Sequence, residues 1–229
     1  MSFDQPMPPF NASDPSATFL STSCLDFLLI ELVPMTYRIA NELDAASSSN
    51  ADISNTSNGT PEPRSNGAGR ETASNAATGT GTAGASSRRL DEDEERDAVF
   101  FRLEGLGYRV GLGLVERFSR DRPRFNDTLD AIKFICKDLW MLVFKKQVDN
   151  LKTNHRGVYV LTDNSFRPLS RMSADPGGQA VVRAQPFLWF PCGIVRGALA
   201  AMGIAATVQA ESSELPGAVF QIKTVPLKQ

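Results

Sequence analysis

The first run of apolar residues recurs every three or four positions and predicts a helix from about Cys24 to Asp44. Its members are Leu25, Leu28, Leu29, Leu32, Ile39 and Leu43. The opposite side of the same helix is also apolar, so we expect the helix to be covered on two sides. Pro34 removes a backbone hydrogen bond and is expected to kink the helix near Ile30.

The segment from Ala45 to Ser87 contains almost only Ser, Thr, Asn, Gly and Ala. It cannot bury enough apolar surface to offset its ordering entropy, so it is predicted to be a disordered insertion. Residues 1–21 carry several prolines and are expected to form a flexible N-terminal segment. Residues 22–229 are then expected to form one domain that residues 45–87 interrupt.

A second helical pattern begins at the acidic run Asp91–Glu95, which suits the positive end of a helix dipole. Gly107 is expected to end this helix, and residues 108–118 are expected to form another short helix. A long amphipathic helix is predicted from about Asp127 to Thr153.

Beyond this helix the apolar period changes from about 3.6 to 2. A hairpin is predicted around Asp163-Asn164, because Val158 and Val160 precede this pair and Phe166 follows it. Its second strand contains Pro168 and is therefore expected at a sheet edge.

Residues 173–185 are predicted to be a loop, and a helix is predicted from Pro191 to Gly203. Gly193 and Gly197 in that helix would let a neighbouring element approach closely. Residues 204–211 and 218–224 alternate as a final hairpin. The predicted fold class is α+β, with four to five helices on one face of a twisted four-stranded antiparallel sheet.

The chain has 24 basic and 26 acidic residues, so its charges nearly cancel. This balance argues against extensive nucleic-acid binding but excludes few other functions. No apolar run reaches the roughly 18 to 20 residues that span a bilayer, and residues 1–10 lack the order of a signal peptide. A cytoplasmic protein is therefore expected. Cys24, Cys136 and Cys192 lie in apolar surroundings and are interpreted as small core residues.

No motif in the chain supplies convincing catalytic chemistry. The glycines from Gly105 to Gly113 follow a helix instead of a strand, so they indicate a close-packed helix–helix turn and not a phosphate loop. His155, the single histidine, is expected to be exposed or to cap a turn. A nucleophilic Cys136 or Cys192 would need a paired base that the sequence does not indicate. No metal or cofactor site is predicted.

Six basic residues between positions 117 and 146 form a candidate basic cluster. Its members are Arg117, Arg120, Arg122, Arg124, Lys145 and Lys146. Acidic residues such as Glu116 and Asp121 interrupt it, which is typical of a solvated helix surface. The alternative is a patch that faces an anionic membrane or an acidic partner.

Several segments together resemble one family of scaffold proteins. They are LDAIKFICKDLW from Leu129, LKTNHRGVYVLTDN from Leu151, FPCGIVRGAL from Phe190, LGYRVG from Leu106 and AVFQI from Ala218. The chain resembles the Bet-three-like small subunits of the TRAPP complex, and among them the subunit 6 family.

This resemblance implies a non-catalytic subunit that pairs with a Bet-three-type subunit and other small TRAPP subunits. The complex tethers vesicles in endoplasmic reticulum to Golgi transport and acts as an exchange factor for a Rab GTPase, which is a partner of the chain through the complex. A location peripheral to cis-Golgi and endoplasmic reticulum membranes is implied. The acylated cysteine of the Bet-three subunit is replaced by Pro123, so Cys-linked acylation is not expected.

The surplus apolar surface of the first helix supports a partner-binding role. The expected interface and core residues are Leu25, Leu28, Leu29, Leu32 and Ile39, followed by Phe100, Leu103 and Leu106. The alternative function is a lipid- or acyl-binding module whose helices enclose an apolar pocket.

Overall fold

The computed structural model describes residues 21–55, 91–120, 122–154, 156–172 and 179–225. The helices are α1 (Thr22–Asn55), α2 (Glu92–Phe118), α3 (Thr128–Phe134), α4 (Trp140–Phe144), α5 (Gln179–Ala184) and α6 (Trp189–Ala201). The strands are β1 (Asn150–Thr153), β2 (Val158–Asp163), β3 (Ala206–Glu211) and β4 (Ala218–Thr224).

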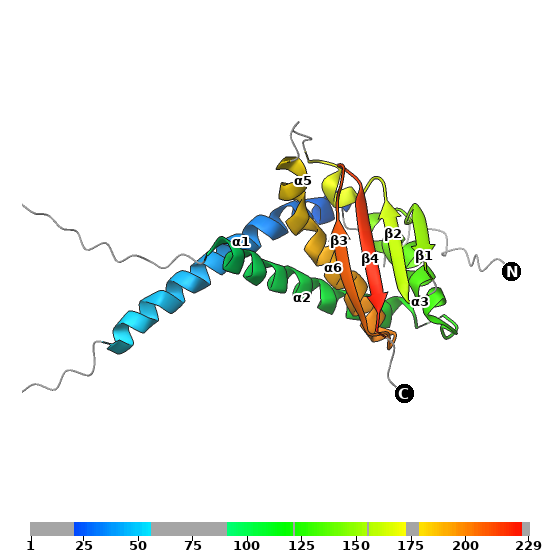
Figure 1. Ribbon diagram of the computed structural model, residues 1–229, viewed down its shortest axis with the longest axis horizontal. Helices are drawn as coiled ribbons and strands as arrows, with labels where there is room; N and C mark the ends of the chain where they lie inside the picture. Colours follow the sequence, from blue (N-terminus) through cyan, green and yellow to red (C-terminus); the bar gives the residue numbers. More distant parts are fainter. Residues whose placement is uncertain (1–20, 56–90, 121, 155, 173–178, 226–229) are drawn as a thin grey trace, which may run out of the picture.

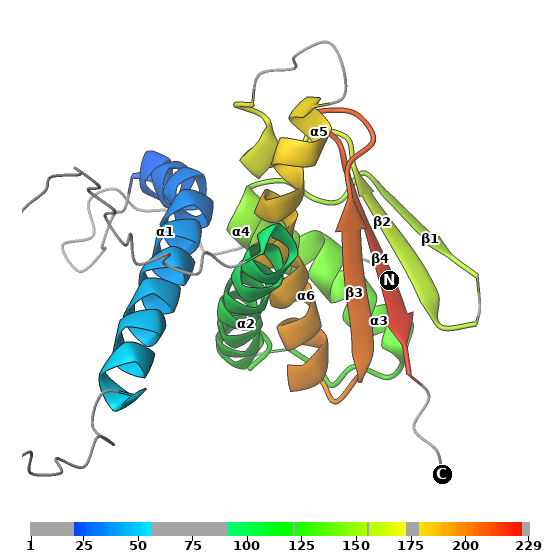
Figure 2. The same ribbon diagram turned by 60° about the vertical axis from the view of Figure 1, so that its left-hand side comes forward.

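The elements form successive layers (Figures 1 and 2). The sheet lies on one side, α3, α4 and α6 cover one of its faces, α2 packs on α6, and α1 is outermost. The strand order is β1-β2-β4-β3, and all three pairings are antiparallel. The predicted α+β class, with helices on one face of a four-stranded antiparallel sheet, is confirmed.

Aromatic rings fill the space between α4 and the central strands. The ring of Trp140 lies 4.7 Å from that of Phe144 and 5.1 Å from that of Phe220, and Phe166 lies 5.4 Å from Phe220. Each of these side chains is fully buried. They form the centre of the core, where large rings bury the most apolar area.

The predicted hairpin around Asp163-Asn164 is wrong. The strand before it, β2, pairs with β1 on one side and β4 on the other, and the residues after it form a short 3-10 turn, η2 (Arg167–Leu169). The turn that joins β1 to β2 contains Gly157, whose φ of 78° favours glycine. Phe166 belongs to the core instead of a strand.

The predicted long helix ends well before Thr153. It comprises α3, a π-helical segment η1 (Ile135–Leu139) and α4, and Lys145 stops it in the left-handed conformation with φ of 63°. The carboxylate of Asp127 caps the start by accepting from the N–H of Asp130 at 2.7 Å. The residues expected to form its last turns form β1.

The π-helical segment follows from the spacing of the buried residues. Ile132, Cys136, Trp140 and Phe144 are all buried and recur every fourth position. An α-helix turns about 100° per residue, so a four-residue repeat drifts about 40° at each step. The wider turns of η1 counter this drift and keep the four side chains in the core.

The prediction that Gly107 ends a helix is also wrong, because α2 runs without interruption from Glu92 to Phe118. Gly107 and Gly111 lie where α2 meets α6. A methyl group on Gly107 would stand 2.1 Å from the carbonyl oxygen of Phe190, and one on Gly111 would stand 2.2 Å from that of Ile194. These glycines serve close packing and not a turn.

The partner helix repeats the arrangement. A methyl group on Gly193 would stand 2.1 Å from the carbonyl oxygen of Glu104, and one on Gly197 would stand 2.0 Å from that of Tyr108. The expected close approach at Gly193 and Gly197 is therefore confirmed. Each helix presents two glycines four residues apart, so the two backbones touch along two turns.

Arg196 adds a polar contact at the same crossing. Both its Nε and its Nη2 donate to the carboxylate of Glu104, the latter at 2.7 Å. Its guanidinium carbon lies 4.4 Å from the centre of the Tyr108 ring. A paired, stacked arginine of this kind fixes one rotation of α6 relative to α2.

Helix α1 differs from its prediction at the C-terminal end. It continues to Asn55, so residues 45–55 are helical and not part of a disordered insertion. Ala45, Ala46 and Ala51 have high helix propensity and continue the helix that the packed part of α1 begins, although the serines and asparagines between them do not favour it. The rest of the predicted insertion, residues 56–87, and the predicted flexible residues 1–20 lie outside the described residues.

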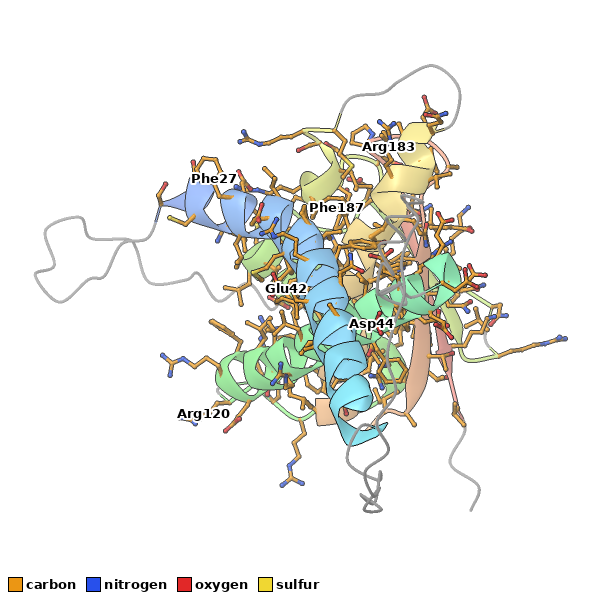
Figure 3. All side chains as sticks on the ribbon, turned by 90° about the vertical axis from the view of Figure 1, so that its left-hand side faces the viewer. Phe27, Glu42, Asp44, Arg120, Arg183 and Phe187 are labelled. Atoms are coloured by element: carbon orange, nitrogen blue, oxygen red, sulfur yellow. The ribbon has the colours of Figure 1, made fainter. Side chains whose placement is uncertain are left out.

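Figure 3 shows that α1 bends between Phe27 and Glu42, the part that contains Pro34.

Two smaller differences concern the segment before α6. Residues 179–184 form α5 and residues 185–188 form a 3-10 turn, η3 (Gln185–Leu188), so this part of the predicted loop is helical. Residues 173–178 of the predicted loop lie outside the described residues. Helix α6 starts at Trp189, just before Pro191, and Gly203 follows its end with φ of 79°. The final hairpin, β3 with β4, is confirmed.

Substitution of Gly197 by alanine should destabilise the chain by about 3 kcal/mol or more, because the added methyl group overlaps the α2 backbone. Gly113→Ala is the matched control, since a methyl group there meets nothing within 4 Å. That control should stabilise the helix by up to about 1 kcal/mol. Urea unfolding measures both, and equal effects would contradict the close-contact interpretation.

Candidate functional site

Helix α1 is held to the rest of the molecule by polar contacts near its start. The carboxylate of Asp26 accepts from Arg167 Nε at 2.7 Å and from Arg171 Nη2 at 3.2 Å. The Arg167 hydrogen bond, with both positive charges, holds the pKa of Asp26 below its usual range although burial opposes the shift. Asn41 Nδ2 also donates to Glu95 Oε1 at 2.7 Å, which ties α1 to α2.

One stripe of α1 packs into the core. Leu29, Leu32, Val33 and Ala40 are buried, at the spacing of a single helix face. Thr36 lies on the same stripe, and its hydroxyl donates to the carbonyl oxygen of Leu32 at 2.7 Å. This hydrogen bond lets a polar residue occupy a buried position.

The next stripe of α1 is apolar and exposed. Leu28 is 55% exposed, and Met35 and Ile39 follow it at seven and eleven residues along the same flank. Phe27, Ile30 and Leu43 are exposed as well. In Figure 2, α1 is the outermost layer, with no other described element on its outer side.

Helix α2 also carries exposed apolar residues. Phe101 is 77% exposed, and Phe100 is exposed while its ring edge meets Trp189 at 5.6 Å between centroids. Figure 3 shows α1 crossing α2. We name the exposed apolar residues of the two helices the α1–α2 face: Phe27, Leu28, Ile30, Met35, Ile39, Leu43, Phe100 and Phe101.

The predicted interface residues divide between this face and the core. Leu28, Ile39 and Phe100 are exposed. Leu29, Leu32 and Leu103 are buried, so they are core residues and not surface residues. Leu25 and Leu106 are partly buried against the core. The sequence interpretation did not select Phe101, which is the most exposed of the large apolar residues that the structure describes.

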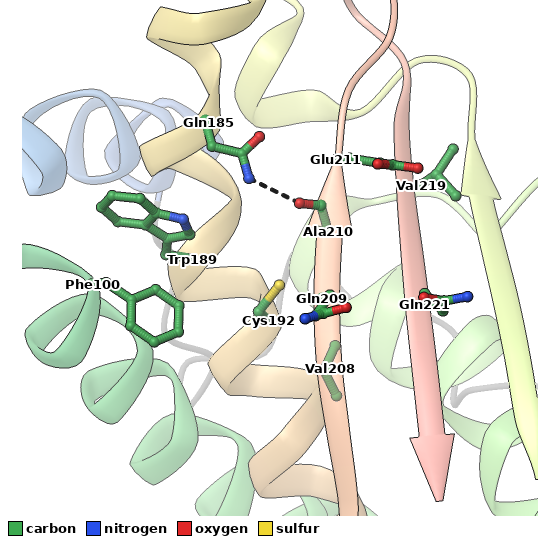
Figure 4. A pocket seen from close by; sticks show the side chains of 10 residues that line it. All are labelled: Phe100, Gln185, Trp189, Cys192, Val208, Gln209, Ala210, Glu211, Val219 and Gln221. Carbon is green, nitrogen blue, oxygen red and sulfur yellow. Dashed lines mark hydrogen bonds between the residues drawn. The ribbon is translucent and has the colours of Figure 1, made fainter. Parts of the chain in front are cut away.

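A cavity of about 470 Å³ lies beside the edge strand β3 (Figure 4). Phe100, Trp189 and Cys192 form its apolar wall, and Gln185 Nε2 donates to the carbonyl oxygen of Ala210 at 3.0 Å across it. Burial and the nearby charge of Glu104 raise the pKa of the Cys192 thiol to about 12. Burial likewise raises the pKa of Cys136 to about 12. Both thiols stay protonated near neutral pH and are poor nucleophiles. Cys136 and Cys192 are core residues as predicted, but the same prediction is wrong for Cys24, which is exposed near the start of α1.

A second cavity, of about 510 Å³, lies between the end of α2 and the segment from η1 to α4. Arg122 and Lys145, two members of the predicted basic patch, line it. Arg117, Arg120 and Arg124 are exposed near the same end of the molecule. We name this hollow the α2–α4 pocket.

A family model described as a transport protein particle (TRAPP) component matches residues 25–225. The chain belongs to the TRAPP component family. Trafficking protein particle complex subunit 6b of Danio rerio is 53% identical over 130 residues, which cover 57% of this chain and 82% of that protein. Subunit 6A of Homo sapiens is 50% identical over 120 residues, which cover 52% of this chain and 74% of that protein. The resemblance to the subunit 6 family is confirmed.

A structure of trafficking protein particle complex subunit 3 from Naegleria fowleri, covalently bound to palmitic acid, has a TM-score of 0.47 and 16% identity to this TRAPP subunit. It covers 57% of this chain and 82% of that one. A likeness at this level adds nothing to the family assignment.

The described part of the TRAPP subunit contains no helix long and apolar enough to cross a membrane. Within the same residues, no group of three or more His, Cys, Asp and Glu is placed to hold a metal ion. His155 lies outside the described residues, so its predicted exposure stays a prediction.

Lys146 does not belong to the basic surface of the TRAPP subunit. Its ammonium lies 2.6 Å from Asp163 Oδ1 and 2.9 Å from Asp149 Oδ2. Burial by itself would lower the pKa of Lys146. The hydrogen bonds to Asp163 and Asp149, with the negative charges of both, outweigh burial and raise the pKa of Lys146. The predicted patch therefore loses one cation to an internal network.

Asp163 is the centre of that network. Its carboxylate is 1% exposed and accepts from Trp140 Nε1 at 2.9 Å and from the N–H of Ser165 at 3.0 Å, in addition to Lys146. The network joins α4, the end of β2 and the segment that leads to Phe166. A buried carboxylate needs such partners, since an unpaired charge in the core is costly.

Asp163→Asn should destabilise the TRAPP subunit by about 3 kcal/mol, because it leaves the Lys146 ammonium without its buried partner. Asp130→Asn removes one member of an exposed pair with Lys133 at 3.5 Å and should change stability by less than about 0.5 kcal/mol. Thermal unfolding at neutral pH compares the two variants. A negligible effect of Asp163→Asn would show that the network is not required.

Proposed function

We propose that this TRAPP subunit is a non-catalytic assembly subunit that pairs with a Bet-three-type subunit through the α1–α2 face. The complex would tether vesicles in endoplasmic reticulum to Golgi and Golgi transport and act as the exchange factor for a Rab GTPase. The chain would meet the Rab and the membrane through the assembly. Its place would be the cytoplasm, peripheral to cis-Golgi and endoplasmic reticulum membranes.

The observation that carries the pairing proposal is the apolar surface left on α1 and α2. Soluble monomers seldom expose several large apolar side chains side by side. Leu28, Met35 and Ile39 form a continuous flank next to the buried stripe, and Phe101 lies on the neighbouring helix. Fully covered aromatic and aliphatic anchors of this kind supply most of the free energy of an interface.

The attachment of α1 supports the same proposal. Asp26 and Asn41 fix the helix at both ends of its packed part, through Arg167 and Glu95. The exposed flank is therefore presented on a positioned helix. A preorganised surface loses less conformational entropy when a partner binds.

The alternative of an acyl-binding module has less support. Trp140, Phe144, Phe166 and Phe220 are fully buried and fill the middle of the described core. The two cavities described above are open hollows at the surface, lined in part by polar groups. The family resemblance places Pro123 roughly where the Bet-three subunit has its acylated cysteine, so Cys-linked acylation is not expected there.

Leu28→Asp combined with Ile39→Asp should weaken binding of a purified Bet-three-type subunit at least about 100-fold, because each change buries a charge in the proposed interface. Val182→Asp is the control, since Val182 is 71% exposed on α5, outside the α1–α2 face. It should alter the Kd less than about threefold. Size-exclusion chromatography with light scattering, followed by titration calorimetry, measures complex formation.

Two outcomes would count against the proposal. One is that the wild-type chain and the Bet-three-type subunit form no complex, and the other is that the double variant binds as tightly as Val182→Asp does. Circular dichroism of the double variant checks that it is folded, which the exposure of both side chains leads us to expect.

A further inference from the structure

The α2–α4 pocket has an apolar interior. Its walls are formed by Leu114 and Phe118 from α2, by Phe134 and Leu139 from α3 and η1, and by Met141 and Leu142. At the mouth, Phe118 is 46% exposed and Met141 is 44% exposed. A hollow of about 510 Å³ with such walls accepts one or two large apolar side chains.

The rim of the pocket is positively charged. Arg122, Lys137 and Lys145 line it, and Asp138 is the one acidic residue among the described lining residues. The carboxylate of Asp138 is already paired with Arg122. Lys137 and Lys145 are both exposed beside the apolar mouth.

The last turn of α2 and the residues just after it extend this charge. Arg117 and Arg120 are exposed close to Phe118 in sequence, and Figure 3 shows Arg120 projecting from this end of α2. Glu116 is the nearby acidic residue on the helix. The cations thus outnumber the carboxylates around the pocket, which attracts an acidic ligand.

The π-helical segment places these groups. Lys137, Asp138 and Leu139 come from η1, while Cys136 and Trp140 on either side of them are buried. The wide turn lets one short stretch supply both core residues and pocket residues. Such π-helical turns are often found at functional sites.

We infer that the α2–α4 pocket is a docking site for an acidic amphipathic helix of a protein partner, whose apolar side chains enter the pocket while its carboxylates meet Lys137, Lys145, Arg117 and Arg120. A helix presents apolar anchors at i and i+3 or i+4 about 5 to 6 Å apart. That spacing matches one or two anchors in a single hollow. A membrane surface fits less well, because its headgroups cannot fill a concave apolar pocket.

This site is separate from the α1–α2 face. Phe101 and Phe118 lie about 26 Å apart along α2 at 1.5 Å per residue. The inference does not rest on the proposed pairing with a Bet-three-type subunit, and both partners can bind at once. The TRAPP subunit would then connect two proteins through opposite ends of α2.

The test uses the full-length chain and three fluorescein-labelled peptides of about 16 residues. One is an acidic amphipathic helix with Leu and Phe at i, i+3 and i+4 and Glu at the other positions. The second has the same apolar positions with Lys in place of Glu, and the third is a scrambled acidic peptide. Fluorescence anisotropy gives the Kd at low and at physiological salt.

The acidic amphipathic peptide should bind, and the Lys-bearing and scrambled peptides should bind at least about 10-fold more weakly. Lys137→Gln with Lys145→Gln should weaken the acidic peptide at least about 10-fold, and Met141→Asp should do the same. Lys133→Gln is the matched control because Lys133 is an exposed lysine of α3 outside the pocket. It should change the Kd less than about twofold.

Failure of the acidic peptide to bind, or equal binding of the scrambled peptide, would overturn the inference. Equal loss with Lys133→Gln would also overturn it, because the effect would then be one of overall charge. Flotation with phosphatidylserine vesicles is measured in parallel. Vesicle binding that depends on Lys137 and Lys145, without peptide binding, would assign the pocket to a membrane instead.

Discussion

The glycine contacts between α2 and α6 set the distance on which the other layers depend. Gly107 and Gly111 on one helix, and Gly193 and Gly197 on the other, each place a backbone where a methyl group would overlap its neighbour. Because the backbones touch, α6 stays close to β3 on its other side, and α2 lies near enough to the sheet to support α1. Arg196 and Glu104 then fix the rotation of the pair. The outward position of α1, and hence the α1–α2 face, follows from this packing.

The sequence predicted three of the four strands and most of the helical content, because periodicity is a local property. Ala206–Glu211 and Ala218–Thr224 alternate cleanly, and they form the expected hairpin. The errors arose where tertiary contacts decide. Gly107 has the local properties of a helix end, yet the α6 backbone makes glycine necessary inside a helix. Phe166 follows a turn-like Asp-Asn pair, but its burial against Trp140 draws the chain into the core instead of into a strand.

The site was predictable only in part for the same reason. A surplus of apolar residues on the first helix indicated a partner. The pattern did not show which of two adjacent leucines is buried: Leu29 lies in the core, whereas Leu28 is exposed. That division depends on where α2 and η3 lie, which no local pattern encodes. Lys146 is a polar residue whose position likewise depends on tertiary contacts. In sequence it belongs to a basic cluster, whereas the burial of Asp163 beside Trp140 makes it an internal partner.

The central claim is that the outer face of α1 and α2 is the surface another TRAPP subunit covers. Hydrogen exchange measured by mass spectrometry, on the chain alone and in complex with a Bet-three-type subunit, tests it most directly. We expect amides of α1 from Leu28 to Leu43, and of α2 around Phe101, to exchange at least about 10-fold more slowly in the complex, while those of β1 and β2 keep their rates. Unchanged exchange in α1 and α2, with protection confined to β1 and β2, would contradict the account.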